Sequence, residues 1–314
     1  MRILIFGSGA VGSAIAARLH LKGYDVHIVG REQHIQKIKD EGLKVKGIWG
    51  EFVVRDIKAY TEIPKEQKFD AVLITVKTFS NQDAVNSIIS SKIKADIFIS
   101  MQNGLGNYEF FSQYLHPVGS ARVIFGIVFE KPGEIEITVW GGPILFGFWD
   151  TKFYKEENKA VKIMKNISDI FSDSGLPSEF VEDIRTPIWE KALYNSALNP
   201  LSVILNTTYG NIILNPFTRE ISREIISEGI SISQKEGANV KDDFFDKFEK
   251  RLVPPTKDHI SSMIQDIKIR GKTEIDSMCG AIVKYGIKHN IQAKVNFTMW
   301  NLIKALEKNT KKIE

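Results

Sequence analysis

The chain has 314 residues, of which 43% are hydrophobic and 25% charged, and its formal net charge is +4. These values are typical of a globular protein with room for two domains, and the interleaving of both charge signs excludes the concentrated basic stripe of a nucleic-acid binder. Cys279 is the only cysteine, which excludes an intrachain disulfide and favours a reducing compartment. Neither a signal peptide nor an apolar run approaching the ~20 residues of a membrane helix is recognisable, so we expect a cytoplasmic protein without a membrane partner.

The first half of the chain alternates between short apolar runs and segments of helical periodicity. This alternation predicts an α/β domain with a parallel sheet covered by helices on both faces. The predicted strands are residues 3–6, 25–29, 69–76 and 96–100, and the predicted helices are residues 10–21, 31–41 and 81–89. Residues 43–60 are predicted to form a pair of strands and residues 121–148 consecutive strands, so we expect the sheet to be mixed at one end.

The second half of the chain is predicted to be helical almost throughout. Apolar residues recur at helical spacing in four long segments, residues 185–198, 217–236, 271–289 and 295–309. We therefore predict two domains, residues 1–182 and residues 183–314, with a change from α/β to all-helical structure between them.

A glycine-rich turn follows the first predicted strand and opens the first predicted helix. The motif reads Gly7-Ser8-Gly9-Ala10-Val11-Gly12. In such a turn Gly7 permits the sharp bend, Gly9 lets a pyrophosphate approach the backbone, and Gly12 permits close packing of helix on strand. The helix N-terminus offers N–H groups and a positive dipole end to the phosphates. The alternative is a glycine-rich turn that binds no ligand.

The end of the second predicted strand distinguishes between the two nicotinamide cofactors. NAD sites carry a carboxylate about 20 residues after the turn, where it accepts hydrogen bonds from the ribose 2′-hydroxyl. Here that position is Arg31, whose guanidinium suits the 2′-phosphate of NADP (NADPH). Glu32 is adjacent and is the residue that would serve NAD instead.

Polar residues that suit a substrate site lie in both halves of the chain. Lys77 and Asn103 follow two predicted strands, at the sheet edge where open α/β folds bind ligands. Lys191, Asn195 and Asn199 are spaced by four in an apolar helical segment and therefore share one helix face. The alternatives are ordinary loop residues for the first pair and a solvated stripe on a surface helix for the second set.

A third polar set lies at residues 261–276. Ser262, Asp266, Arg270 and Glu274 are spaced by four. Such spacing by itself favours a ladder of ion pairs on a helix surface, each worth a few tenths of a kcal/mol. A substrate-binding role is the alternative.

Taken in order, these motifs resemble those of the ketopantoate reductase family, and the resemblance covers nearly the whole chain. The motifs are GSGAVGS, VKTF, QNGLGN, WEKALYNSALNPLS and SSMIQDIKIRGKTEID. The resemblance implies a Rossmann-type N-terminal domain followed by an all-helical C-terminal domain, with the active site in the cleft between them. It also implies NADPH-dependent reduction of 2-dehydropantoate (ketopantoate), a small 2-oxo acid, to pantoate in pantothenate and coenzyme A biosynthesis.

The family's functional residues fall on the polar residues already singled out. The resemblance places its cofactor-contacting and catalytic lysines on Lys77 and Lys191, its cleft asparagines on Asn103, Asn195 and Asn199, its substrate-binding serine on Ser262, and its carboxylates on Asp266 and Glu274. Two family features are absent. Residues 277–280 read SMCG where the family often has Tyr-Leu/Ile-Asn-Gly, and residues 293–296 lack the proline that often precedes the last helix.

The resemblance also implies a mechanism, in which Lys191 is the general acid that stabilises and protonates the developing alkoxide. Asn103 and Ser262 would bind the substrate carboxylate or hydroxyl, and Glu274 would accept a hydrogen bond from the 4-hydroxyl. Two alternatives stay open, a reductase of another small 2-oxo acid and a regulator that binds NADP without turnover. No metal is expected, and the apolar faces of the final helices are compatible with a homodimer.

Overall fold

The computed structural model describes residues 1–150 and 158–309. The chain falls into two compact units, one formed by Met1–Gln102 with Asn107–Ile184 and the other by Asn103–Gly106 with Arg185–Glu314. The short segment Asn103–Gly106 therefore belongs with the second unit although it lies within the sequence of the first. None of the described helices is both long enough and apolar enough to cross a membrane.

The first unit is built on an eight-stranded sheet with the order β12-β11-β8-β7-β6-β1-β2-β5. Its strands are β1 (Arg2–Phe6), β2 (Asp25–Val29), β5 (Lys58–Tyr60), β6 (Lys68–Ile74), β7 (Lys94–Ser100), β8 (Val118–Arg122), β11 (Ile144–Gly147) and β12 (Ser178–Phe180). All neighbouring strands run parallel except β8 and β11, which are antiparallel. The predicted parallel sheet with one mixed end is confirmed.

Helices cover both faces of this sheet because successive strand residues point to opposite sides. The helices of the first unit are α1 (Ala10–Leu21), α2 (Glu32–Glu41), α3 (Asn81–Ser91), α4 (Asn107–Phe111) and α5 (Lys159–Asp173). Ile3 and Ile5 of β1 share a core with α1, α2 and α5, whereas Leu4 between them shares a core with α3 and α4. Helix α5 was not predicted from the sequence.

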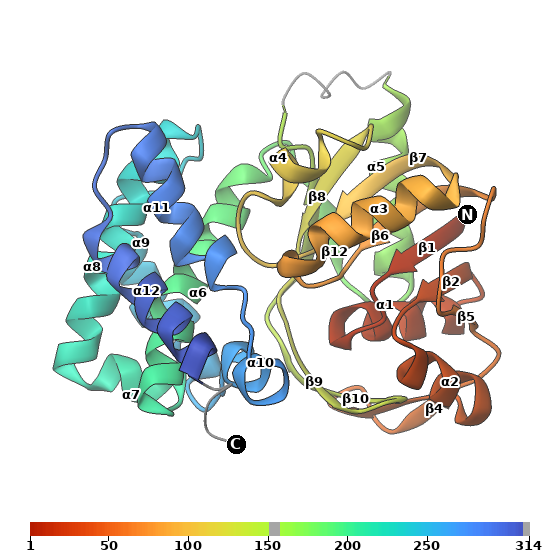
Figure 1. Ribbon diagram of the computed structural model, residues 1–314, viewed down its shortest axis with the longest axis horizontal. Helices are drawn as coiled ribbons and strands as arrows, with labels where there is room; N and C mark the ends of the chain where they lie inside the picture. Colours follow the sequence, from red (N-terminus) through yellow and green to blue (C-terminus); the bar gives the residue numbers. More distant parts are fainter. Residues whose placement is uncertain (151–157, 310–314) are drawn as a thin grey trace. The chain divides into compact units, whose positions relative to one another are not determined.

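A second sheet of four strands, ordered β4-β3-β10-β9, covers the outer side of α1. Its strands are β3 (Leu43–Gly47), β4 (Phe52–Val54), β9 (Phe125–Lys131) and β10 (Glu134–Trp140) (Figure 1). The pair of strands predicted in residues 43–60 is confirmed as β3–β4, but the sequence did not predict the third strand of this segment, β5, or the separation of β3 and β4 into a second sheet. The segment forms three strands, and the antiparallel pairs β3–β4 and β9–β10 unite because β3 runs parallel to β10.

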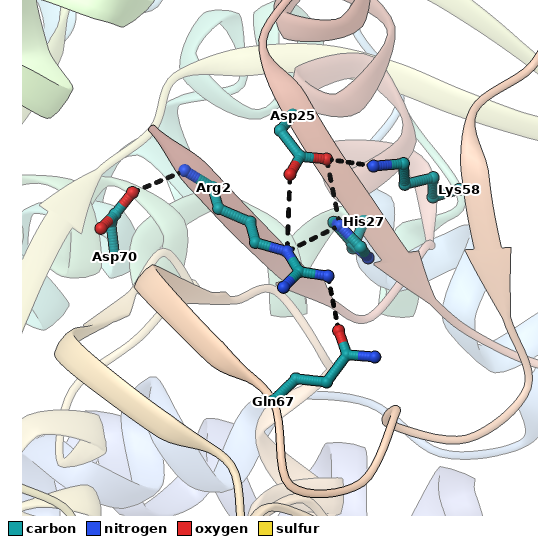
Figure 2. Close-up of polar contacts among 6 residues, drawn as sticks. All are labelled: Arg2, Asp25, His27, Lys58, Gln67 and Asp70. Atoms are coloured by element: carbon teal, nitrogen blue, oxygen red, sulfur yellow. Dashed lines mark hydrogen bonds and ion pairs between the residues drawn. The ribbon is translucent and has the colours of Figure 1, made fainter.

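The amino ends of the parallel strands are held together by charged side chains (Figure 2). The Asp25 carboxylate at the start of β2 pairs with Lys58 of β5 at 2.6 Å and with Arg2 of β1 at 3.4 Å. Arg2 also donates from its guanidinium to Gln67 at 2.5 Å and from its backbone N–H to Asp70 at 2.6 Å. These groups satisfy one another, so we interpret this edge as structural and look for ligand groups at the opposite, carboxyl edge.

In the second unit, every element that the structure describes between Arg185 and Asn309 is helical (Figure 1). The α-helices are α6 (Arg185–Leu205), α7 (Tyr209–Leu214), α8 (Pro216–Lys235), α9 (Phe244–Lys247), α10 (Ser262–Arg270), α11 (Cys279–Lys288) and α12 (Lys294–Asn309). The predicted helix over residues 271–289 was wrong in its first part. Gly271 ends α10 in the left-handed conformation, and a 3₁₀ turn, η5 (Ile275–Ser277), precedes α11.

Helix α6 continues past a proline because another group takes over the hydrogen bond that is lost. Pro200 has no N–H, so it donates nothing to the carbonyl of Ser196 one turn earlier. The buried thiol of Cys279 donates to that carbonyl at 3.7 Å instead. Burial raises the pKa of Cys279 to about 12, which keeps the thiol protonated as a donor.

Candidate functional site

The glycine-rich turn joins β1 to α1 and has the geometry that the sequence predicted for two of its glycines. Gly7 has a φ of +116°, and a Cβ there would lie 2.6 Å from the backbone N of Val76. A Cβ on Gly12 would lie 2.2 Å from the carbonyl oxygen of Gly7 and 2.7 Å from the Thr75 hydroxyl. Both positions therefore require glycine for the fold itself, whether or not a ligand binds.

Gly9 differs because the space beside it is open. A Cβ on Gly9 would have no described atom within 4 Å. Its φ of −73° suits any residue, so the backbone gives no reason for glycine at this position. The neighbouring Ser8 hydroxyl is buried and has no hydrogen-bond partner among the described residues. An open position over a helix N-terminus beside an unsatisfied buried hydroxyl fits a bound pyrophosphate.

Arg31 lies at the carboxyl end of β2 and precedes the first turn of α2. Its side chain is exposed, and it makes no ion pair within the described part of the chain. The preceding residue, Gly30, leaves room for the Ser8 hydroxyl, which would lie 1.7 Å from a Cβ at that position. The glycine-rich turn and the Arg31 position are thus in contact through Gly30. Glu32, the alternative that serves NAD, is exposed in the first turn of α2.

An amide network that the sequence analysis missed fixes the carboxyl ends of β6 and β7. The Gln102 amide donates to the backbone carbonyl of Val76 and to the Asn81 side chain, both at 2.7 Å. Asn81 in turn donates to Asn107 at 3.1 Å. Because Val76 immediately precedes Lys77, this network fixes the backbone from which the Lys77 side chain extends. Gln102 and Asn107 stand in the QNGLGN motif, which was the available signal.

In the second unit, Lys191 of α6 donates from its ammonium to the Asn103 side-chain oxygen at 2.5 Å. The segment carrying Asn103 is fastened to η5, because Leu105 donates from its N–H to the Ser277 carbonyl at 2.7 Å. Gly104 has a φ of +83°, and a Cβ there would lie 2.6 Å from that same carbonyl oxygen. The structure thus brings together two residues that are 88 positions apart in the sequence.

The two asparagines that follow Lys191 on α6 are both buried, Asn195 at 9% and Asn199 at 1% exposure. Asn199 accepts a hydrogen bond from the Tyr209 hydroxyl at 2.6 Å. Burial raises the pKa of Tyr209, which keeps the phenol neutral and able to donate. The interpretation of this stripe as a solvated surface is therefore wrong for Asn195 and Asn199. A substrate contact for either residue stays a prediction.

The residues spaced by four at 262–274 separate into two groups. Asp266 and Arg270 form the predicted ion pair at 2.5 Å on α10. Glu274 lies beyond the end of α10 and does not continue the ladder, and it is 4% exposed. Ser262 is the first residue of α10, whereas its neighbour Ser261 caps the helix. Glu274 and Ser262 are therefore the members of this set that the helix geometry does not explain.

The described residues contain no group of three or more His, Cys, Asp or Glu that could hold a metal ion. The chemistry available in the second unit is that of a lysine ammonium, amides and carboxylates. In the first unit it is that of a glycine-rich turn, a helix N-terminus and an arginine. Together these features place the protein in the class of oxidoreductases that bind a pyridine dinucleotide on a Rossmann-type sheet.

Comparison with known families identifies the family within this class to which the chain belongs. The family model described as ketopantoate reductase PanE/ApbA matches residues 3–151, and the model of its C-terminal part matches residues 183–307. The protein belongs to this ketopantoate reductase family. The 2-dehydropantoate 2-reductase of Aquifex aeolicus is 33% identical to it over 316 residues, which cover 98% of this chain and 97% of that protein.

Solved structures agree with this assignment. A PanE/ApbA family ketopantoate reductase from Ralstonia eutropha JMP134 superposes with a TM-score of 0.87 at 25% identity, covering 99% of this chain and 100% of that chain. A D-mandelate dehydrogenase in a ternary structure with NADH and anilino(oxo)acetate superposes with a TM-score of 0.89 at 24% identity, covering 99% of each chain. The second likeness shows the fold alone.

Proposed function

We propose that this protein catalyses the NADPH-dependent reduction of 2-dehydropantoate to pantoate, a step of pantothenate and coenzyme A biosynthesis. The observation that carries the proposal is the 2.5 Å hydrogen bond from the Lys191 ammonium to Asn103, in the two motifs where the family resemblance places its catalytic groups. The name of the Aquifex aeolicus relative supports the substrate.

The proposal assigns dinucleotide binding to the first unit. The N–H groups at the start of α1 and the open space beside Gly9 suit the pyrophosphate, and the exposed guanidinium of Arg31 suits a 2′-phosphate. The remaining residues of the motif line the same turn, and Lys77 contributes a second positive charge at the carboxyl edge of the sheet. When bound, the nicotinamide supplies the hydride that the ketone carbon accepts.

Lys191 is assigned to the proton. Reduction of a ketone places negative charge on its oxygen, and an ammonium close to that oxygen both stabilises the charge and donates a proton to it. An ammonium has three N–H donors and no acceptor. Because Asn103 accepts one of these N–H groups, it fixes the direction in which the others point. Asn103 is therefore assigned to the orientation of Lys191 as well as to substrate contact.

The substrate's other polar groups are assigned to buried and half-buried side chains of the second unit. Glu274 would accept a hydrogen bond from the 4-hydroxyl, while Asn195, Asn199 and Ser262 would contact the carboxylate and carbonyl. Asp266 is assigned to the same substrate site, and its carboxylate forms an ion pair with Arg270. A 2-oxo acid without the hydroxyl would not make this hydrogen bond, and a site built to bind a substrate hydroxyl discriminates strongly against analogues that lack it.

A substrate panel tests the proposal. Purified protein is assayed with 2-dehydropantoate, benzoylformate, pyruvate and 2-oxoisovalerate, each with NADPH and with NADH, and cofactor oxidation is followed by absorbance. We expect kcat/KM to be highest for 2-dehydropantoate with NADPH. A clear preference for benzoylformate would support a reductase of another 2-oxo acid. Nucleotide binding without turnover of any substrate would support a regulator.

A further inference from the structure

A buried chain of hydrogen bonds ends on the glycine-rich turn and begins 125 residues further along the sequence, at the β9–β10 hairpin. The Gly133 N–H lies 2.9 Å from His34 Nδ1, and His34 Nε2 lies 3.0 Å from the Ser13 hydroxyl. The Ser13 hydroxyl donates to the backbone carbonyl of Ser8 at 3.0 Å. His34 and Ser13 are 4% and 0% exposed, so water does not compete for these groups.

The two ends of this series of hydrogen bonds determine which atom donates and which accepts in each bond. A backbone N–H can only donate, so Nδ1 of His34 must carry a lone pair and the proton of the neutral ring must sit on Nε2. Nε2 then donates to the Ser13 oxygen. A carbonyl oxygen can only accept, so the Ser13 proton points to Ser8. One tautomer of His34 and one rotamer of the Ser13 hydroxyl satisfy the whole chain.

The bond to Ser8 determines the orientation of the next N–H. The carbonyl of Ser8 and the N–H of Gly9 belong to one planar trans peptide and point in opposite directions. Because Ser13 lies on α1 and holds the carbonyl toward the helix, the Gly9 N–H is turned away from it. Within the described residues this N–H makes no hydrogen bond, and no described atom lies within 4 Å of the position that a Cβ of Gly9 would take.

We propose that His34 and Ser13 are positioning residues that hold the Ser8–Gly9 peptide with its N–H directed at the pyrophosphate of the dinucleotide. This inference rests on the proposed function, since it requires that the turn binds NADPH. His34 also lies one turn after Arg31, whose carbonyl accepts from the His34 N–H at 3.1 Å. His34 thus contacts both segments, the one assigned to the pyrophosphate through its imidazole and the one assigned to the 2′-phosphate through its backbone N–H.

Packing alone does not account for this arrangement. The imidazole contacts the Phe129 ring at 5.0 Å between centroids, and an aromatic or aliphatic side chain would fill that space. A leucine or phenylalanine would leave the Gly133 N–H and the Ser13 hydroxyl without their present partner, whereas a histidine satisfies both. The series of hydrogen bonds ends on the Ser8 carbonyl, in the turn to which the proposed function assigns the pyrophosphate.

The central test is Ser13→Ala, which removes the last hydrogen bond and leaves the His34 contact with Gly133 in place. Dissociation constants are measured for NADP⁺ and for 2′-AMP, which carries the 2′-phosphate but has no pyrophosphate. We expect the constant for NADP⁺ to rise about tenfold, a change of about 1.4 kcal/mol, and that for 2′-AMP to stay within about twofold of wild type. The KM for NADPH should rise with it, while kcat at saturating NADPH is retained.

Two substitutions of His34 provide matched controls. His34→Gln places an amide N–H near the position of Nε2 and so can still donate to Ser13, whereas His34→Asn places its polar atoms near Nδ1 and cannot reach Ser13. We expect His34→Gln to bind NADP⁺ nearly as wild type does and His34→Asn to match Ser13→Ala. Thermal unfolding of each variant shows whether the fold is intact, and the comparison is made on variants that unfold cooperatively.

The outcomes separate the inference from the proposed function. Wild-type protein that binds neither NADPH nor NADP⁺ refutes the proposed function. Wild-type protein that binds both, with Ser13→Ala unchanged in affinity for NADP⁺, refutes the positioning role alone. Equal weakening of NADP⁺ and 2′-AMP also refutes it, because a general loss of structure does not distinguish the pyrophosphate. The positioning role is supported if Ser13→Ala and His34→Asn lose affinity for NADP⁺ but not for 2′-AMP, and if His34→Gln retains affinity for NADP⁺.

Discussion

Replacing Gly12 or Gly9 by alanine adds one methyl group to the glycine-rich turn in two different surroundings. At Gly12 the new Cβ would lie 2.2 Å from the Gly7 carbonyl oxygen, inside the protein. At Gly9 it would meet no described atom within 4 Å. The first substitution therefore tests the fold of the turn, and the second tests the presence of a ligand above it.

For Gly12→Ala we expect a loss of stability. Contact at 2.2 Å with a backbone oxygen can be relieved only by moving α1 away from β1, since neither partner is a flexible side chain. Overpacking of a close-packed core costs about 1–3 kcal/mol, which is larger than the gain of up to ~1 kcal/mol from the better helix propensity of alanine. The net free energy of unfolding should fall by about 1–2 kcal/mol.

For Gly9→Ala we expect stability within about 1 kcal/mol of wild type, because φ at this position already suits alanine and the space is open. Binding should change instead. A methyl group in the space assigned to the pyrophosphate displaces a phosphate from its charge-assisted hydrogen bonds, each worth about 1.5–3 kcal/mol. The dissociation constant for NADPH should therefore rise at least about tenfold.

The two variants are compared by urea unfolding without nucleotide and by fluorescence titration with NADPH. We expect Gly12→Ala to have a lower free energy of unfolding than wild type. We expect Gly9→Ala to keep the wild-type stability but to bind NADPH more weakly. If Gly9→Ala bound NADPH as tightly as wild type, the pyrophosphate would not lie beside Gly9 and the assignment of this turn would be wrong. If Gly12→Ala were as stable as wild type, the tight packing of α1 on β1 would not hold.

Three further predictions concern other parts of the molecule. Arg31→Asp should weaken NADPH binding by about 1.5–3 kcal/mol and NADH binding far less, and equal loss for both by titration would refute the 2′-phosphate assignment. Glu274→Ala should lower kcat/KM mainly for 2-dehydropantoate, and equal damage with 2-oxoisovalerate in the same assay would contradict its bond to the hydroxyl. Burial lowers the pKa of His34 from 6.5 to about 4, so the folded protein takes up this proton less readily than the unfolded chain. Stability should therefore fall as the pH drops from 6.5 to about 4, by up to about 3 kcal/mol, and this fall should be absent in His34→Gln.

Much of the sheet could be predicted because its strands are buried on both faces. Residues 3–6 are a continuous apolar run that coincides with β1, and the predicted strands at residues 25–29 and 96–100 likewise coincide with strands of the structure. The second sheet could not be predicted in this way. Glu134 of β10 pairs with Lys44 of β3, a residue 90 positions earlier in the sequence, and both strands bear charged residues and alternate like ordinary edge strands.

The residues of the candidate site also divide into those that the sequence predicted and those that it did not. Gly7 and Gly12 were identified because their roles depend on local backbone geometry, which a short motif encodes. The contact of His34 with Ser13 and Gly133 joins three segments that nothing in the local sequence connects. The prediction of a helix that begins at Gly271 was wrong for a local reason. Gly271 adopts the left-handed conformation that ends α10, although the apolar residues that follow it recur at helical spacing.

The central claim is that Lys191 donates the proton, and comparing Lys191→Ala with Lys191→Arg tests it most directly. Arginine retains the positive charge and can still donate a hydrogen bond to Asn103, but its pKa above ~12 prevents it from giving up a proton near neutral pH. In a steady-state assay with 2-dehydropantoate and saturating NADPH, both variants should lose about 10²–10⁴-fold in kcat while NADPH affinity stays near that of wild type. Near-normal turnover by either variant would contradict the assignment of Lys191 as the general acid.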